Sequence, residues 1–327
     1  MADAAAAGIH CLALPTPFAV GTVNCFLLEG DPLALIDCGP NSPATLLALE
    51  RELEARGYKL ADIGLVVVSH QHMDHLGLVQ TLVQLTGAEV ACIDVLADYV
   101  EHYDVESAAD DLFGYETMLR HGVAPEVVQS LRSSTASRRH AAAAPVRRPL
   151  PAGALLELPN HKLQLLHRPG HSPSDTVFWD VERRIAIVAD HLLRDISSNA
   201  LIANPLPRAD ASTPFRPLIE YRQSLRATHQ QDVALTLTGH GDPVLDHRAL
   251  IDRRLAGHER RATKLHQLLL QRSPRTVRDL AIELFGARAF EQPFLTTSEV
   301  LGHLELLEDE HQVVARERDG RITFSPS

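Results

Sequence analysis

Short apolar runs separated by turn residues mark the beginning of the chain. Residues 22–30 (TVNCFLLEG) and 33–39 (LALIDCG) are two such runs, and the turn around Gly30 to Pro32 stands between them. This pattern predicts a β-hairpin. Residues 63–69 (IGLVVVS) are nearly all apolar, which predicts a strand that is buried on both faces and delivers His70 at its end.

Helical and β-like segments follow one another through the next part of the chain. Residues 42–57 carry apolar side chains at helical spacing, with Ser42 as the cap and Gly57 as the stop. Residues 97–131 also show helical spacing, and residues 133–149 predict an exposed loop. We therefore expect an insertion over 97–149, and such insertions often border ligand pockets. Further β-like runs lie at 162–171, 177–180, 183–190 and 232–240.

The pattern changes near residue 250. Three helical segments (258–270, 276–286 and 297–312) are followed by VVARERDGRITF, a predicted hairpin that turns at Asp319-Gly320. We therefore predict two domains, a larger domain over 1–252 and a small winged-helix-like domain over 253–327.

Composition narrows the class of protein. The apolar fraction is 45%, the charged fraction is 22%, and the net charge of −11 is spread over the chain. These values predict a folded protein that is not generally attracted to nucleic acid or to a membrane. The four cysteines form no CxxC pair, so buried free thiols are expected. The N-terminus lacks the pattern of a signal peptide and no apolar run is long enough to span a membrane, which predicts a cytoplasmic location.

One cluster carries strong candidate chemistry. In SHQHMDH, four ligand-type side chains, His70, His72, Asp74 and His75, fall within six residues directly after the predicted buried strand. Imidazole nitrogens and carboxylate oxygens suit divalent metals such as zinc. Hydrogen-bonded loop histidines, or an aspartate at a helix N-terminus, are the structural alternatives. The local density of ligands favours a metal site, with Asp74 and His75 turned toward a second, neighbouring ion.

Three more ligand-type residues close later β-like runs: His171 in RPGHSPSD, Asp190 in IVADH and His240 in LTGHGDP. Each one alone is weak evidence, because turn histidines are common. Several other histidines lie in polar or helical stretches, and we expect them at the surface: His229, His258, His266 and His311. His167 and His191 are expected to pack or to support the ligands.

The order HxHxDH, then H, D and H, resembles the metallo-β-lactamase superfamily over about residues 10–250. The resemblance implies an αββα sandwich of the α/β (α+β) class and two metal ions, and it makes residues 1–252 the catalytic domain. It implies one ion on His70, His72 and His171, and a second on Asp74, His75 and His240. Asp190 would bridge both ions, and Asp37 would support the ligands from beneath.

Two adjacent divalent ions can share a water and hold it as a bridging hydroxide for attack on a carbonyl or phosphorus centre. Asp74 is the candidate catalytic residue, which would orient this water or shuttle its proton. Zinc is the expected metal, and the same ligands accept iron or manganese.

The metal-ligand motifs do not decide the substrate. The tail, with HxxR at His258–Arg261, resembles a subgroup that contains both acyl-thioester hydrolases and a mitochondrial endoribonuclease. Residues 258–327 carry ten Lys or Arg and eleven Asp or Glu, and this near balance of charge disfavours nucleic-acid binding. We therefore expect a small-molecule substrate with an ester-like acyl bond, a thioester or a lactone. The alternatives are an endoribonuclease or phosphodiesterase, and a non-catalytic metal-binding sensor; a homodimer also stays open.

Two features of the predicted insertion could meet the substrate. Its arginines (Arg132, Arg138, Arg139, Arg147 and Arg148) could contact an anionic group or simply be solvated. Its large side chains (Tyr99, Tyr103, Phe113, Tyr115 and Met118) could wall an acyl pocket or pack on the sandwich.

Overall fold

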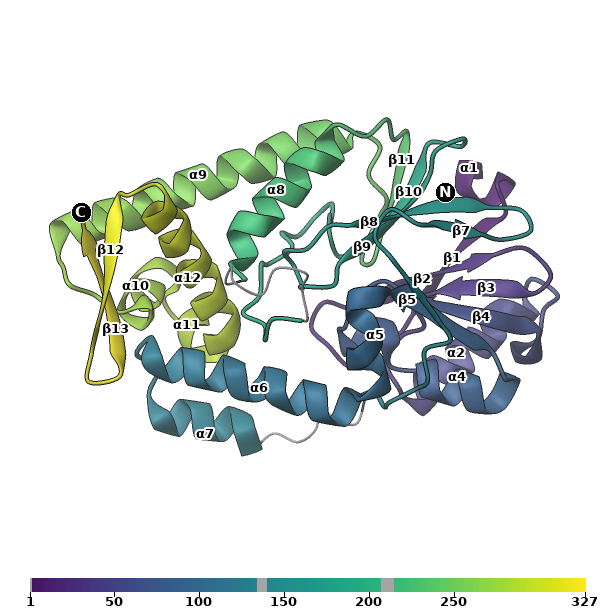
Figure 1. Cartoon of the computed structure of the whole chain (residues 1–327), viewed down its shortest axis with the longest axis horizontal. Helices are drawn as coiled ribbons and strands as arrows, with labels where there is room; N and C mark the ends of the chain where they lie inside the picture. The colour runs from purple at the N-terminus through teal and green to yellow at the C-terminus, as the bar shows by residue number, and fades with distance from the viewer. Residues whose placement is uncertain (1, 134–139, 207–214) are drawn as a thin grey trace.

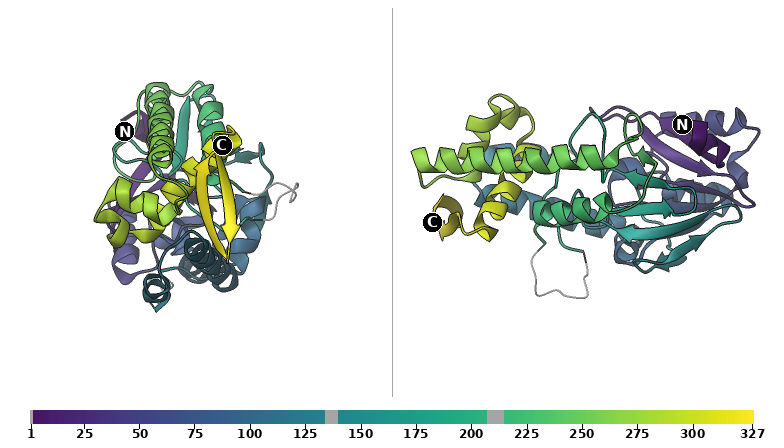
Figure 2. Two further views of the ribbon diagram at one scale, coloured as in Figure 1. Left: turned by 90° about the vertical axis from the view of Figure 1, so that its left-hand side faces the viewer. Right: turned by 90° about the horizontal axis from the view of Figure 1, so that it is seen from above.

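Two β-sheets face each other, and helices cover the outer face of each (Figure 1). The computed structural model describes residues 2–133, 140–206 and 215–327. This arrangement confirms the predicted αββα sandwich. The C-terminal helices form a further region at the end of the molecule away from the N-terminal strands (Figure 2).

The first sheet has the strand order β1-β2-β3-β4-β5-β6. The first three strands pair antiparallel, whereas β3 to β6 run parallel. The antiparallel pairing of β2 with β3 confirms the predicted hairpin. The strands are β1 (Ile9–Leu14), β2 (Val23–Leu28), β3 (Leu33–Ile36), β4 (Ile63–Val68), β5 (Glu89–Ile93) and β6 (Arg148–Leu150).

The second sheet has the order β11-β10-β9-β8-β7. β10 and β11 run parallel, and the other neighbours pair antiparallel. The strands are β7 (Leu155–Glu157), β8 (Lys162–His167), β9 (Thr176–Asp180), β10 (Ile185–Ala189) and β11 (Leu235–Thr238).

The helices of the sandwich follow the strands. Ser42 caps α2 by accepting a hydrogen bond from the backbone N–H of Thr45, as its sequence pattern predicts. The helices are α1 (Ala2–Ala6), α2 (Pro43–Glu54), the 3₁₀ turn η1 (Leu60–Asp62), α3 (Met73–Leu76), α4 (Val79–Thr86), α5 (Asp94–Glu101), α6 (Tyr103–Arg120), α7 (Pro125–Ser133) and α8 (Pro217–His229).

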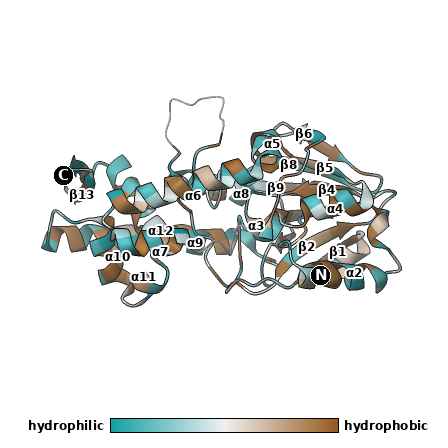
Figure 3. Ribbon diagram, turned by 90° about the horizontal axis from the view of Figure 1, so that it is seen from below, coloured by the Kyte–Doolittle hydropathy of each residue, from teal (hydrophilic) through white to brown (hydrophobic). Residues whose placement is uncertain are grey.

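Alternation along β2 shows how the layers are built. Val23, Cys25 and Leu27 point to the helix-covered side of the first sheet, whereas Phe26 and Leu28 point between the two sheets. All five side chains are buried. β2 is therefore buried on both faces, and the surrounding helices carry hydrophobic and hydrophilic residues together (Figure 3).

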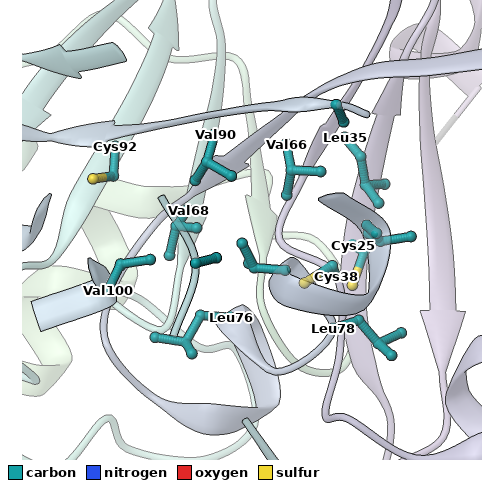
Figure 4. Packing of buried hydrophobic residues seen from close by; sticks show 14 of the residues in the cluster. Cys25, Leu35, Cys38, Val66, Val68, Leu76, Leu78, Val90, Cys92 and Val100 are labelled. Atoms are coloured by element: carbon teal, nitrogen blue, oxygen red, sulfur yellow. The ribbon is translucent and has the colours of Figure 1, made fainter. Parts of the chain in front are cut away.

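The four cysteines are free, and three of them, Cys25, Cys38 and Cys92, are fully buried. They lie among valine and leucine side chains of the first core layer (Figure 4). Burial raises the pKa of the Cys92 thiol to about 12. These thiols pack as small apolar groups, as expected.

The C-terminal region has its own apolar core, formed by its helices and hairpin. The hairpin turns at Asp319-Gly320, as predicted, and both residues have positive φ. α9 passes through residue 252 without a break, so the division of the chain there stays a prediction, as does the winged-helix likeness. The elements are α9 (His247–Gln271), α10 (Val277–Phe285), α11 (Arg288–Glu291), α12 (Pro293–Asp309), β12 (Val313–Arg318) and β13 (Arg321–Pro326).

The predicted loop over 133–149 is only partly correct. Ser133 still belongs to α7, and residues 148–150 form β6, which pairs with β5. An edge strand of three residues is too short to show alternation in the sequence. Within the described ranges, no helix is long and apolar enough to cross a membrane.

Candidate metal centre

Strand ends and short loops bring the predicted ligands to one place. His70 follows β4, while His72 begins the short helix α3, which carries Asp74 and His75. His171 follows β8, Asp190 follows β10, and His240 follows β11. Three groups of side chains each place one ligand atom per residue within 4.8 Å of one another: His70, His72 and His171; His70, His75 and Asp190; Asp74, His75 and His240.

Three imidazole nitrogens converge in the first group. His72 Nδ1 lies 3.0 Å from His70 Nε2 and 3.0 Å from His171 Nε2. The outer nitrogens are engaged elsewhere, because His171 Nδ1 donates to the carbonyl oxygen of Asn199 at 2.8 Å and His70 Nδ1 lies 2.9 Å from Ser69 Oγ. With the outer nitrogens as donors, the lone pairs of His70 and His171 point into the group.

The second group mixes imidazoles with a carboxylate. Asp74 Oδ2 lies 3.4 Å from His240 Nε2, and His240 Nδ1 donates to the carbonyl oxygen of Thr22 at 2.7 Å. His75 Nδ1 donates to Asp37 Oδ2 at 2.8 Å, which turns His75 Nε2 inward. This set offers one oxygen and two nitrogens, a donor set that suits zinc and similar divalent ions.

Asp190 stands between the two groups. Its Oδ1 lies 3.4 Å from His75 Nε2, and its Oδ2 lies 3.6 Å from His171 Nε2 and 3.5 Å from His240 Nε2. The carboxylate therefore faces both groups, as a bridging ligand would.

Asp37 is an acceptor for three donors beneath the centre. It accepts from the backbone N–H of Ser69 at 2.9 Å, from Ser69 Oγ at 2.7 Å and from His75 Nδ1. Asp37 therefore contacts one candidate ligand, His75, and the residue before another, and its role in supporting the ligands stays a prediction.

The residues present fit a metal. His75 Nε2 and Asp190 Oδ1 are buried and, within the described residues, have no hydrogen-bond partner. Such orphaned atoms are costly unless something binds them. Gly239 keeps the space open, because a Cβ there would lie 2.2 Å from Asp190 Oδ1. The role of these side chains as ligands stays a prediction.

Burial and neighbouring charges shift the pKa values of several side chains in the centre. Burial lowers the pKa of His72 to about 3, helped by neighbouring His171. Burial alone would lower the pKa of His240, but the carboxylates of Asp190 and Asp74 outweigh it and raise this pKa to about 10. Burial would raise the pKa of Asp190, and the facing His75 and His240 bring it well below its ordinary value. Metal ligands must be neutral imidazoles and ionised carboxylates, so binding of a metal would release a proton from a protonated imidazole of this cluster.

Strained backbone flanks the centre. Asp37 has φ 59° and Ala189, before Asp190, has φ 44°. These left-handed values are uncommon for residues with a side chain, and they concentrate at functional sites.

Sequence reasoning missed residues that hold the ligand loops. Asn24 Nδ2 donates to the carbonyl oxygens of Thr238 and Gly241 at 2.9 and 2.8 Å, on either side of His240. Ser174 Oγ donates to Gln71 Oε1 at 2.6 Å and so ties the His171 loop to the first cluster. Nothing in the local pattern marks these side chains.

A cavity of about 370 Å³ lies beside the centre, with His72 and Met73 in its wall. α6 supplies Tyr115 and Met118, as one of our two interpretations predicts, whereas Tyr99 and Tyr103 pack in the core. The other lining residues are Asp110, Asp111, Gly114, Leu131, Leu201, Ile202, Ala203 and Phe294.

The predicted arginines do not gather there. None of the described ones lines the cavity, although the Arg132 guanidinium lies 5.6 Å from the centroid of the Tyr115 ring. Arg147 is exposed and Arg148 belongs to β6. Arg138 and Arg139 lie outside the described residues.

Two histidine predictions have opposite outcomes. His258 was expected at the surface, but it is only 6% exposed, because α9 packs it against Tyr221 and His303. His191 packs against α8, as expected, and its Nε2 lies 2.9 Å from Thr228 Oγ1.

A layered sandwich with groups of His and Asp at its strand ends has the form of a metal-dependent hydrolase. The family model described as "Metallo-beta-lactamase superfamily" matches residues 19–240, and the chain belongs to this superfamily.

Three similar proteins match this chain along almost its whole length. A Bacillus subtilis (strain 168) protein described as "Probable metallo-hydrolase YqjP" is 31% identical, with 97% of each chain covered. The crystal structure of the metallo-beta-lactamase family protein TTHA1429 from Thermus thermophilus has a TM-score of 0.79 and 27% identity, and covers 98% of this chain and 99% of its own. A beta-lactamase domain protein from Burkholderia ambifaria, with a TM-score of 0.82, 24% identity and coverage of 98% and 92%, shares the fold.

Proposed function

We propose that this hydrolase cleaves an ester-like acyl bond, a thioester or a lactone. The observation that carries the proposal is the cavity of about 370 Å³ beside His72, whose walls include Met118, Leu131 and Phe294. Sites for small ligands have this size and mostly apolar walls. An acyl chain in this cavity would have its carbonyl next to the metal centre.

Two divalent ions, zinc by preference and iron or manganese otherwise, would be held by the side chains described above. His70, His72 and His171 would hold one ion, Asp74, His75 and His240 the other, and Asp190 would bridge them. When bound, such ions supply Lewis acidity, which brings the pKa of water toward neutrality and polarises a carbonyl oxygen.

Asp74 would orient the attacking water and accept its proton. Its side chain is 15% exposed, whereas that of Asp190 is 9% exposed. Asp74 is therefore the more exposed of these two carboxylates. Because it is also a candidate ligand, its role as a base is secondary to its role in positioning.

The lining of the cavity disfavours the nucleic-acid alternative. Among the described residues, it contains no Lys or Arg but two carboxylates, Asp110 and Asp111. Binding of a phosphate backbone depends on cationic side chains. Arg132, next to the Tyr115 ring, could contact an anionic group of a thioester's leaving thiol.

A substrate panel tests the proposal. Metal-loaded protein is incubated with acyl thioesters, lactones and labelled single-stranded RNA. We expect turnover of a thioester or a lactone, its loss in His70→Ala, and wild-type rates in His102→Ala, a histidine whose side chain is 58% exposed. Cleavage of RNA alone would overturn the acyl assignment, and no turnover by metal-loaded protein would favour the sensor.

A further inference from the structure

Helix α8 touches two of the loops that carry candidate ligands. The Tyr221 hydroxyl donates to the carbonyl oxygen of His191, next to Asp190, at 2.8 Å. Three residues further along α8, Ser224 Oγ donates to the carbonyl oxygen of Pro169 at 2.8 Å. One helix thus bonds the loop after β10 and the loop that leads into His171.

No side chain would fit at Gly170, where the His171 loop contacts α8. A Cβ at Gly170 would stand 2.3 Å from both Cα and Cβ of Tyr221. The backbone directly before His171 therefore packs on the backbone of α8. Any shift of α8 at Tyr221 would be passed to His171, because protein interiors are close-packed.

The contact with the Asp190 loop is equally close. His191 Nε2 lies 2.9 Å from Thr228 Oγ1, and its ring meets the Tyr221 ring edge-on with 5.8 Å between centroids. Both His191 and Tyr221 are 1% exposed. The residue after Asp190 is thus held by α8 at its carbonyl oxygen, its ring nitrogen and its ring edge.

We propose that Tyr221 is a positioning residue, through which α8 sets the distance between His171 and Asp190 and so the affinity of the centre for its metal ions. The proposal rests on the metal centre assigned above, but not on the identity of the substrate. His171 and Asp190 lie on separate loops, and their facing atoms stand 3.6 Å apart. Residues that orient metal ligands commonly change metal affinity tenfold to a hundredfold when removed.

Tyr221 also reaches the C-terminal region. The centroid of its ring lies 6.0 Å from the ring centroid of His258 on α9. The His258 ring centroid in turn lies 5.7 Å from that of His303 on α12. The C-terminal helices therefore stand behind α8 and help to fix its position. This gives them a role at the metal centre in addition to the place of Phe294 in the cavity wall.

The test is metal binding by Tyr221→Phe, which keeps the ring and removes the hydroxyl. Tyr99→Phe is the matched control, because Tyr99 is 6% exposed and packs in the first core layer away from α8. Zn²⁺ affinity is measured by competition with a chelator. The visible spectrum of the Co²⁺-loaded protein reports ligand geometry independently of affinity.

We expect Tyr221→Phe to bind Zn²⁺ about tenfold more weakly with an altered Co²⁺ spectrum, while Tyr99→Phe matches the wild type. Ser224→Ala carries the same test if Tyr221→Phe fails to fold. Wild-type affinity and spectrum in folded Tyr221→Phe would overturn the proposal, as would an equal loss in Tyr99→Phe. Where Tyr221→Phe does not fold, wild-type values in Ser224→Ala would overturn it. Absence of ester turnover would overturn only the proposed substrate class.

Discussion

Asp37 Oδ2 accepts a hydrogen bond from His75 Nδ1 at 2.8 Å, and the two side chains are 1% and 0% exposed, respectively. The same carboxylate holds Ser69, whose hydroxyl lies against His70. One buried aspartate therefore orients a candidate ligand of each metal group.

Asp37→Ala is expected to lower metal affinity by tenfold to a hundredfold, because the His75 ring loses the acceptor that fixes its orientation. The measurement is Zn²⁺ competition with a chelator. Asp98→Ala is the matched control, because Asp98 pairs with His102 in the same way, at 3.0 Å, but at the surface. Unchanged affinity in Asp37→Ala would show that His75 is oriented by other contacts.

Leu131→Trp is expected to shorten the acyl cavity. Leu131 lines the cavity from α7 and is only partly buried, so a larger side chain there should cost little stability. We expect KM to rise about tenfold for long acyl chains and to stay unchanged for an acetyl group, since each lost methylene contact is worth about 1 kcal/mol. Leu112→Trp, on the exposed side of α6, is the control. An equal effect on short and long chains would argue against this cavity as the acyl site.

His258→Gln is expected to reduce the loss of stability in acid. Burial, with neighbouring His303 and Arg222, lowers the pKa of His258 to about 3. The unfolded chain, with a pKa near 6.5, binds this proton more tightly, so folding stability is lost as pH falls through about 6.5. Between pH 7 and pH 5 this difference amounts to about 2 kcal/mol.

The pH effect is measured by urea unfolding of metal-free protein at both pH values. His266→Gln, on the same helix but reaching solvent, is expected to keep the wild-type dependence. If His258→Gln loses as much stability as the wild type, His258 already takes up a proton in the folded state.

Local patterns in the sequence predicted most of the candidate centre. Ligands at His70, His72, Asp74 and His75 are neighbours in the chain, so a buried strand followed by a short helix is enough to gather them. The later ligands could be found because each ends a β-like run, and strand ends meet at one edge of the sandwich.

Apart from those of Asp37, which the family resemblance implied, the supporting contacts could not be predicted, because they join distant segments. Asn24 and Thr238 are 214 residues apart, and only the sandwich brings them together. α8 was missed because its buried face includes polar residues, Arg222, Ser224 and Thr228, which interrupt the apolar spacing of a helix. β5, with its short run EVACI, carried too few residues to separate strand from helix.

The most direct test of the central claim is a titration of metal-free protein with Zn²⁺, in which bound metal and hydrolysis of an acyl thioester or lactone are followed together. Our account predicts no hydrolysis without metal, a rise with added Zn²⁺, and a plateau when two ions are bound per chain. Full hydrolysis by metal-free protein, or none with two ions bound, would contradict it.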